Sequence, residues 1–288
     1  MKVLITGCSG FIGFHTSNYF LKKKWKVLGI DNNNNYYHKQ LKLDRLNILK
    51  QSKNFRFVNY DLSKNSLESN KIIFDFKPTY LIHLAAQPGV RFSIINPKKN
   101  FDYNIKAFFN VLELAQKIKV KHFMFASSSS VYGNQERKMS EELPTDNPVS
   151  FYAATKKTNE IMAYAYSSIY KLNCTGLRFF TVYGPYGRPD MSPIIFLNSI
   201  FKRKSIILNN YGNHSRDFTY VDDVSKTIFL LIKKTSKKAV PYQILNIGSG
   251  KNTKLKDFVK LIEKFTGIKS NTKFAKFQKG DVKDTVAD

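Results

Sequence analysis

The sequence predicts an α/β protein with a doubly wound parallel sheet, followed by a smaller α/β region. Short apolar segments alternate with amphipathic helical segments five times along the first part of the chain. A run of glycines follows the first apolar segment, and small or polar residues follow the others. Such alternation favours parallel strands joined by right-handed helical crossovers, which place ligands beyond the carboxyl ends of the strands.

Each of the five apolar segments reads as a short strand bounded by turn residues. They span residues 2–6, 26–30, 55–59, 80–84 and 122–126. Helical patterns run to about residue 23, from about residue 99 to residue 118, and from about residue 150. Beyond residue 176 the pattern loosens, and the expected elements are strands near residues 177, 206–209 and 243–247 and helices after residue 223 and at residues 255–265.

The composition is that of an ordinary globular chain with an unusual charge. Of the 288 residues, 42% are hydrophobic and 24% are charged, and the net charge is +26. The lysines are scattered among many asparagines, which indicates a compositional bias, and no basic module for nucleic acid accompanies them. The two cysteines, Cys8 and Cys174, belong to no metal-ligand pattern. Without a signal peptide or an apolar run of ~20 residues, we expect a cytoplasmic protein that binds no membrane, nucleic acid or metal.

The glycine-rich turn after the first strand has the spacing Gly-x-x-Gly-x-x-Gly and opens a helix. Glycines let the backbone approach a pyrophosphate, and the helix N-terminus offers N–H groups and the positive end of its dipole. The residues expected to contact a dinucleotide here are Gly7, Gly10, Phe11, Ile12 and Gly13. Asp31 ends the second strand, where a carboxylate accepts hydrogen bonds from a ribose and repels a 2′-phosphate. The predicted cofactor is therefore NAD and not NADP.

Small, cationic and hydroxyl-bearing residues follow the fourth and fifth strands. The fourth strand leads into Leu84, Ala85 and Ala86, where small side chains leave room for a cofactor. Arg91 follows and is a candidate to bind an anionic group of the substrate, although it could equally be a solvated loop residue. The fifth strand opens into four serines, residues 127–130, at the same predicted edge of the sheet.

Tyr152 and Lys156 lie four residues apart on the next predicted helix and therefore share one face. An ammonium beside a phenol favours the phenolate and lowers the phenol pKa from about 10. Tyr152 is thus a candidate general base near neutral pH. The spacing also arises by chance in ordinary helices, so this interpretation depends on the other residues expected at the edge of the sheet.

Together these features resemble the nucleotide-sugar epimerases of the extended short-chain dehydrogenase/reductase family, and most closely the UDP-glucuronate 4-epimerases. The stretches that carry the resemblance are residues 87–93, 126–133, 150–157, 176–191, 216–223 and Gly280-Asp281-Val282. The resemblance implies a Rossmann domain for NAD over residues 1–176 and a nucleotide-sugar-binding region over residues 177–288, parts of which return to the sheet. It also implies a homodimer. Members are usually some tens of residues longer, so we expect a fragmentary sequence or a less covered site.

The resemblance further implies a catalytic group and a mechanism. Ser128, Tyr152 and Lys156 match the catalytic residues of the family. Tyr152 as a phenolate takes the proton of the sugar 4-hydroxyl while the C4 hydride passes to NAD, and the 4-keto sugar turns over before the hydride returns. Lys156 lowers the tyrosine pKa and holds the nicotinamide ribose. The other residues expected at the cofactor are Asn32, Asp61, Leu62, Asn104 and Ser127.

A uronic acid substrate adds a hazard, because oxidation at C4 creates a β-keto acid that readily loses carbon dioxide. The enzyme must then hold the carboxylate out of alignment with the carbonyl. The planar guanidinium of Arg188 can bind a carboxylate at two points and is the expected clamp, although it could instead brace the backbone of its loop. Ser129, Ser130 and Thr181 are the expected hydroxyl donors. The remaining residues expected at the UDP-sugar are Arg91, Arg216 at the pyrophosphate and Asp281 at the uridine ribose.

Several alternatives stay open. A 4,6-dehydratase carries an Asp-Glu pair where this chain has Ser129 and Ser130, and a UDP-glucuronate decarboxylase carries a glutamate in place of Ser130. UDP-glucose 4-epimerases, the runner-up, usually have Asn-Pro where this chain has Thr181 and Val182. An NAD-binding regulatory protein, the alternative that is not an enzyme, usually lacks the tyrosine or the lysine.

Overall fold

A seven-stranded sheet forms the centre of the protein. The computed structural model describes residues 1–64, 71–135, 138–278 and 281–288; Gly280, which belongs to a stretch that carries the resemblance, lies outside these ranges. All neighbours in the sheet are parallel, in the order β11-β6-β5-β4-β1-β2-β3. The strands are β1 (Lys2–Thr6), β2 (Lys26–Asp31), β3 (Phe55–Asn59), β4 (Tyr80–His83), β5 (His122–Ser128), β6 (Cys174–Phe179) and β11 (Tyr242–Ile247). The predicted parallel sheet is confirmed.

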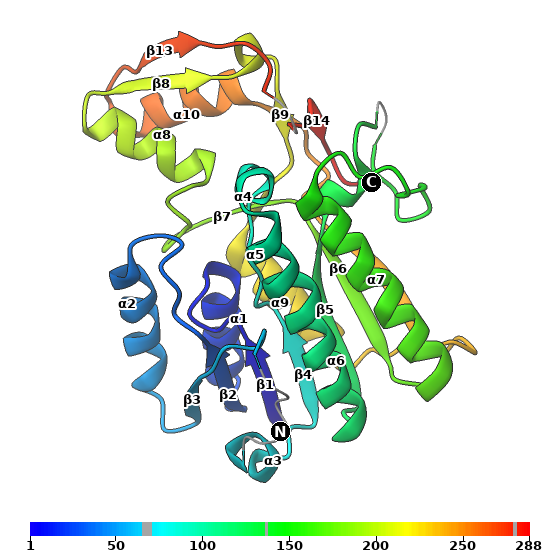
Figure 1. Ribbon diagram of the computed structural model, residues 1–288. Helices are drawn as coiled ribbons and strands as arrows, with labels where there is room; N and C mark the ends of the chain where they lie inside the picture. Colours follow the sequence, from blue (N-terminus) through cyan, green and yellow to red (C-terminus); the bar gives the residue numbers. More distant parts are fainter. Residues whose placement is uncertain (65–70, 136–137, 279–280) are drawn as a thin grey trace.

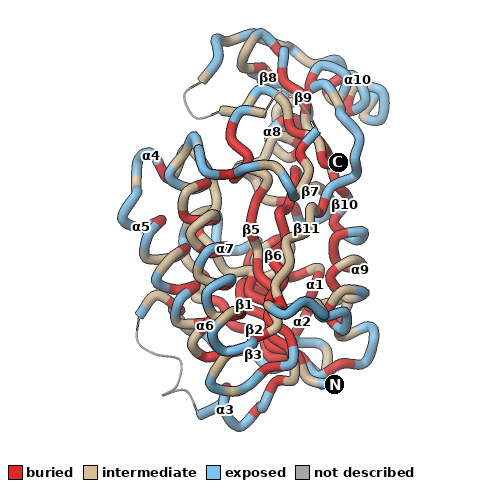
Figure 2. The backbone as a smooth tube through the Cα atoms, turned by 90° about the vertical axis from the view of Figure 1, so that its right-hand side faces the viewer, coloured by how far each residue is buried: buried red, intermediate tan, exposed pale blue. Residues whose placement is uncertain are grey.

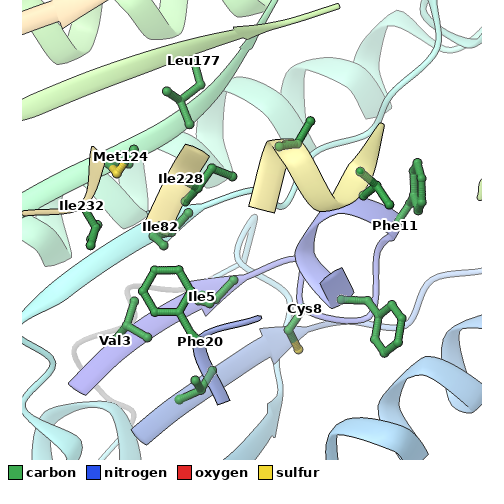
Figure 3. Close-up of a cluster of buried hydrophobic side chains, with 14 of the residues drawn as sticks. Val3, Ile5, Cys8, Phe11, Phe20, Ile82, Met124, Leu177, Ile228 and Ile232 are labelled. Atoms are coloured by element: carbon green, nitrogen blue, oxygen red, sulfur yellow. The ribbon is translucent and has the colours of Figure 1, made fainter. Parts of the chain in front are cut away.

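Helices cover both faces of this sheet, as Figure 1 shows. One apolar core contains side chains of α1 (Phe11–Lys22), α2 (Lys39–Lys50) and α9 (Val221–Leu231), and the other contains side chains of α3 (Lys71–Phe76), α6 (Ala107–Lys117) and α7 (Phe151–Tyr170). Successive side chains of a strand point to opposite faces, so Val3 and Ile5 join the first core and Leu4 joins the second. Figure 3 shows the first core, and Figure 2 shows buried residues gathered along the central strands.

A smaller group of elements lies beyond the carboxyl ends of the strands (Figure 1). It contains α8 (Ser192–Phe201), α10 (Leu255–Thr266) and the parallel strands β8 (Ser205–Leu208) and β13 (Asn271–Phe274), which share a separate apolar core. Between β8 and α10 the chain returns to the main sheet through α9 and β11. The boundary expected between residues 176 and 177 falls inside β6, and the division into two domains stays a prediction.

Two expected elements differ in the structure. The helix expected from about residue 99 to residue 118 consists of α5 (Pro97–Phe101), a π-helical turn (Asp102–Lys106) and α6. Such a turn widens the helix locally, which a 3.6-residue pattern does not reveal. The strand expected at residues 206–209 is β8, displaced by one residue. The alternation of strands and helices implies a helix where α2 lies but gives it no bounds, and no element is predicted where α8 lies.

Both cysteines, Cys8 and Cys174, are buried and free. Within the described ranges, no helix is both long enough and apolar enough to cross a bilayer. The same residues contain no group of three or more His, Cys, Asp or Glu side chains arranged to hold a metal ion.

Candidate active site

A cavity of about 960 Å³ lies at the carboxyl edge of the central sheet. Its lining includes the glycine turn after β1, the end of β2, the segment after β4 and the serines at the end of β5. Every residue that the sequence predicts at the cofactor or substrate lines this cavity, with the exception of Asn104. The cavity therefore joins residues that lie far apart in the chain.

The glycine turn forms one wall of the cavity. Gly7 has a φ of +72°, which residues with a Cβ rarely adopt. A Cβ on Gly13 would lie 2.0 Å from the carbonyl oxygen of Gly7, so only glycine lets α1 pack this close to the turn. No side chain caps the N-terminus of α1 at Gly10, which leaves N–H groups of its first turn available to an anionic ligand. These features fit the pyrophosphate of a dinucleotide.

Asp31 and Lys42 shape the cavity at the end of β2. The Asp31 carboxylate accepts hydrogen bonds from the backbone N–H groups of Ser9 at 3.2 Å and Asn33 at 2.9 Å. Lys42, on α2, donates to the backbone and side-chain oxygens of Asn34 at 3.0 and 2.7 Å. Burial lowers the pKa of Lys42, and the charge of Asp31 opposes this effect. Lys42 thus places a cation in the cavity beside Asp31, a feature that no sequence motif indicates.

Asn104 lies behind the cavity wall because both ends of its amide are already bonded. Its oxygen accepts from the Gln87 N–H at 2.7 Å, and its nitrogen donates to the Gln87 carbonyl at 3.0 Å and the Thr155 hydroxyl at 3.1 Å. Asn104 does not line the cavity, and its expected place at the cofactor stays a prediction. Its position in the π-helical turn lets it brace the segment after β4 against α7.

The three predicted catalytic side chains come from β5 and α7. Tyr152 and Lys156 lie near the start of α7, whose N-terminus is capped by the Ser150 hydroxyl. The Lys156 Nζ lies 5.9 Å from the centre of the Tyr152 ring and donates to the Ala126 carbonyl at 2.9 Å. Ser128 ends β5, and its hydroxyl acts to lower the pKa of the Tyr152 phenol. The structure thus brings the predicted serine, tyrosine and lysine together at one wall of the cavity.

Burial has the largest effect on the pKa values of both Tyr152 and Lys156. It raises the pKa of Tyr152, although the charge of Arg188 and the Ser128 hydroxyl act to lower it. Burial also lowers the pKa of Lys156 to about 8. The low phenol pKa expected from a neighbouring lysine is therefore not found, because the loss of water around the phenolate outweighs the charge of Arg188 and the Ser128 hydroxyl.

Arg188 is already held by a carboxylate of the protein itself. Its Nε and Nη2 donate to the two oxygens of Asp190 at 3.0 and 2.6 Å. The Tyr36 hydroxyl donates to the same carboxylate at 2.8 Å. The two-point grip on a substrate carboxylate that the sequence predicts for Arg188 is thus taken by Asp190. Arg188 instead supplies a charge that acts on Tyr152.

The hydroxyls of the four serines at the end of β5 and just after it make different hydrogen bonds. The Ser127 hydroxyl donates to Glu160 at 2.5 Å, and Glu160 accepts two bonds of 2.9 Å from the buried Arg178. Ser127 therefore lines the cavity, but its hydroxyl proton is already donated to Glu160. The hydroxyls of Ser129, Ser130 and Thr181 line the cavity without a hydrogen-bond partner among the described residues, so a ligand can use them.

Three predicted substrate residues, Arg91, Arg216 and Asp281, form a charged group at the cavity. Arg216 donates to two backbone carbonyls at 2.7 and 2.9 Å. Burial lowers its pKa, and the charges of Asp281 and Asp284 oppose this effect. Asp281 also pairs with Arg91 at 3.8 Å. The group presents both a cation and a carboxylate to a ligand.

Sequence patterns missed four residues around the cavity: Tyr36, Lys42, Arg45 and Asp190. Tyr36 lies just past Asn32–Asn35, a segment read as no more than a turn, although Asn32 itself is predicted at the cofactor. Asp190 stands two residues after Arg188, and this short spacing between opposite charges is the one signal that could have indicated the pair. Lys42 and Arg45 lie on α2, a helix for which the sequence patterns give no bounds.

Enzymes with a doubly wound sheet bind nucleotide cofactors in a cavity at the carboxyl edge of that sheet. The fold and the cavity of this protein are those of this class of enzyme. Residues 3–248 match the NAD dependent epimerase/dehydratase family. The chain belongs to this family.

Relatives of known name extend this result over the whole chain. The protein CapI of Staphylococcus aureus is 42% identical, with all of this chain and 90% of the relative aligned. A UDP-glucuronate 4-epimerase of Thermodesulfobacterium geofontis is 41% identical over 99% of this chain and 87% of the relative. The solved UDP-glucuronic acid 4-epimerase of Bacillus cereus, in complex with UDP-glucuronic acid and NAD, superposes with a TM-score of 0.92 at 32% identity, covering all of this chain and 90% of that one.

Proposed function

We propose that the protein is an NAD-dependent 4-epimerase that interconverts UDP-glucuronate and UDP-galacturonate through a 4-keto sugar. One observation carries the proposal: Tyr152, Lys156 and Ser128 meet at the same cavity as the glycine turn and three free hydroxyls. The first group suits oxidation of a sugar alcohol, and the hydroxyls suit a carboxylate. The names of the relatives in Thermodesulfobacterium geofontis and Bacillus cereus support the same substrate.

The cofactor site fits NAD at two places, the N-terminus of α1 and the end of β2. The uncapped N-terminus of α1 would hold the pyrophosphate, and Asp31 would accept from the adenosine ribose. When bound, NAD supplies the reversible oxidation at C4. The other residues that would contact it are Phe11, Ile12, Asn32, Asp61, Leu62, Leu84, Ala85, Ala86 and Lys156.

Tyr152 moves the proton in this proposal. Its phenol oxygen takes the proton of the sugar 4-hydroxyl and later returns it, while the Ser128 hydroxyl donates to the same sugar oxygen. The charge of Arg188 and the Ser128 hydroxyl favour the ionised phenol against its burial. The planar 4-keto sugar can be reduced on either face once it turns over, which yields the two C4 epimers.

The sugar carboxylate would be held by hydroxyls rather than by the Arg188 fork. Ser129, Ser130 and Thr181 offer three free donors, whereas Asp190 already occupies the fork. Fixing the carboxylate in the plane of the ring prevents alignment of the C5–carboxylate bond with the 4-keto group and so prevents loss of carbon dioxide. Arg216 would bind the pyrophosphate of the UDP group and Asp281 the uridine ribose, with Arg91 beside it.

Product identification with a panel of UDP-sugars tests the proposal. The purified protein is incubated separately with UDP-glucuronate, UDP-galacturonate and UDP-glucose, without added NADH, and products are separated by chromatography. Interconversion of the two uronates is expected. A pentose product with carbon dioxide would identify a decarboxylase, and exclusive action on UDP-glucose would identify the runner-up.

A homodimer in the cytoplasm completes the proposal. Helices α6 and α7 are packed against each other and carry large apolar side chains that are exposed in the single chain. They include Phe109, Ile161, Tyr164 and Ile169. A molar mass of two chains in light scattering is expected, and a single-chain mass in Ile161→Glu would locate the interface on α7.

A further inference from the structure

Two loops that line the cavity meet at one side-chain contact. Residues 32–38 follow β2, and residues 184–191 follow β7 (Thr181–Tyr183) and carry Arg188. The Tyr36 hydroxyl of the first loop donates to the Asp190 carboxylate of the second at 2.8 Å. We call this Tyr36–Asp190 contact the clasp. It joins segments that are 154 residues apart in the chain.

The buried Arg45 is hydrogen-bonded to both loops that the clasp joins. Arg45 of α2 is 0% exposed and has no carboxylate partner among the described residues. Its guanidinium donates to the Ser9 carbonyl in the glycine turn at 2.9 Å, to the Tyr37 hydroxyl at 2.6 Å and to the Tyr186 carbonyl at 2.6 Å. One side chain thus links both loops of the clasp to the turn that would bind the pyrophosphate.

A third segment that lines the cavity, residues 89–92, packs against Tyr36. The Tyr36 ring packs edge-on against Phe92, with the ring centres 5.3 Å apart. A Cβ on Gly89 would lie only 2.8 Å from the Tyr36 hydroxyl oxygen, and Gly89 has a φ of +104°. The missing side chain at Gly89 therefore gives the phenol the room it needs beside Asp190.

We propose that the clasp is a latch that retains NAD, because it fastens residues 32–38, which follow Asp31 on the cofactor side of the cavity, to residues 184–191 on its substrate side. NAD then leaves only after the Tyr36–Asp190 bond has broken. This inference rests on the cofactor site of the proposed function but not on the identity of the sugar. An epimerase returns its NAD unchanged after each turnover, so slow release does not limit it.

Protonation keeps the clasp formed over a wide pH range. Burial, helped by the charge of Asp190, raises the pKa of Tyr36 to about 12. Burial alone would raise the pKa of Asp190, but the bonds from Arg188 and Tyr36 lower it below its usual value. The phenol therefore stays a donor and the carboxylate a charged acceptor, which is the stronger kind of hydrogen bond.

Release of prebound NADH tests the latch without any sugar. The loaded protein is mixed with a large excess of NAD, and the loss of bound-NADH fluorescence gives the release rate. Tyr36→Phe removes the donor but keeps the ring, and we expect release to be roughly tenfold faster, as for one hydrogen bond to a charged group. Tyr211→Phe is the matched control, because its exposed hydroxyl has no partner among the described residues. An unchanged rate in Tyr36→Phe overturns the latch.

A double-mutant cycle separates the clasp from general loosening. Asp190→Ala removes the acceptor. If both residues act through their shared bond, the double variant releases NADH no faster than Asp190→Ala alone. Effects that multiply would reject the clasp. A protein that binds NADH but converts no UDP-sugar contradicts the proposed function alone, whereas unchanged release contradicts the latch alone.

Discussion

The cofactor side of the cavity is built from backbone, whereas the substrate side is built from paired charges. On the cofactor side, Gly7 turns the chain at a φ of +72° and Gly13 lets α1 pack against that turn. On the substrate side, Asp190 holds Arg188 and Asp281 pairs with Arg91. A backbone site accepts few substitutions, because its shape depends on residues without a Cβ. A paired-charge site can be retuned when one partner changes, so the two sides should respond differently to substitution.

Removal of the Tyr152 hydroxyl tests the point where the two sides meet. Tyr152→Phe keeps the ring in α7 but removes the group that moves the proton, so we expect turnover to fall roughly 10³-fold or more. Steady-state rates on UDP-glucuronate measure this loss, and the NAD content of the purified variant should match that of the wild type. Turnover within tenfold of the wild type would remove Tyr152 from the mechanism.

A methyl group on Gly13 tests the backbone side. In Gly13→Ala the new Cβ would meet the Gly7 carbonyl at 2.0 Å, so the turn must shift. We expect NAD affinity to fall roughly 100-fold and the free energy of unfolding to fall by about 2 kcal/mol, as for overpacked sites. Calorimetric titration with NAD and urea unfolding measure the two effects.

Gly267→Ala is the matched control for that change. Gly267 has a φ of +69° at the end of α10, but nothing lies within 4 Å of the position that a Cβ would take there. The variant should therefore lose only about 1 kcal/mol of stability, from backbone strain, and bind NAD as the wild type does. Equal losses of NAD affinity in both variants would contradict the special role of the turn.

Loss of the Arg188 charge tests the substrate side. Arg188→Ala should lower kcat/KM for UDP-glucuronate roughly 50-fold more than for UDP-glucose, because only the uronate carries a further negative charge into the cavity. The control is Arg56→Ala, which removes an exposed arginine that does not line the cavity. The same loss on both sugars would mean that Arg188 acts through its loop or through Tyr152 without selecting the substrate.

The buried Lys156 predicts a pH dependence of stability. Burial lowers its pKa from 10.5 to about 8, so between these pH values the unfolded chain binds more protons than the folded chain. Lys156 therefore destabilises the folded protein below pH 8, and this effect disappears as the pH rises through that window. Urea unfolding of wild type and Lys156→Met should show the stability difference shifting by about 3 kcal/mol from pH 7 to pH 10.5 in favour of the wild type. A difference that does not vary with pH contradicts the assignment.

Most of the cavity could be predicted because of what a parallel sheet does to its strand ends. Gly7, Asp31, Ala85 and Ser128 each follow or end a different strand, and parallel strands bring their carboxyl ends to one edge. Asn104 is the exception, because its amide in the π-helical turn is bonded to the Gln87 backbone. Local patterns also cannot place α8, which packs against α10 from a segment far along the chain.

The order of strands and helices, the glycine turn and the Tyr152–Lys156 spacing are local properties, so the sequence by itself determined them. Only the tertiary structure decided which charges pair, since Asp190 meets Tyr36 across 154 residues of chain. It also decided the direction of the Tyr152 pKa shift, because the phenol is buried only once the chain has folded. Periodicity reports which side of an element faces the core, whereas desolvation and ion pairing depend on everything that surrounds a group.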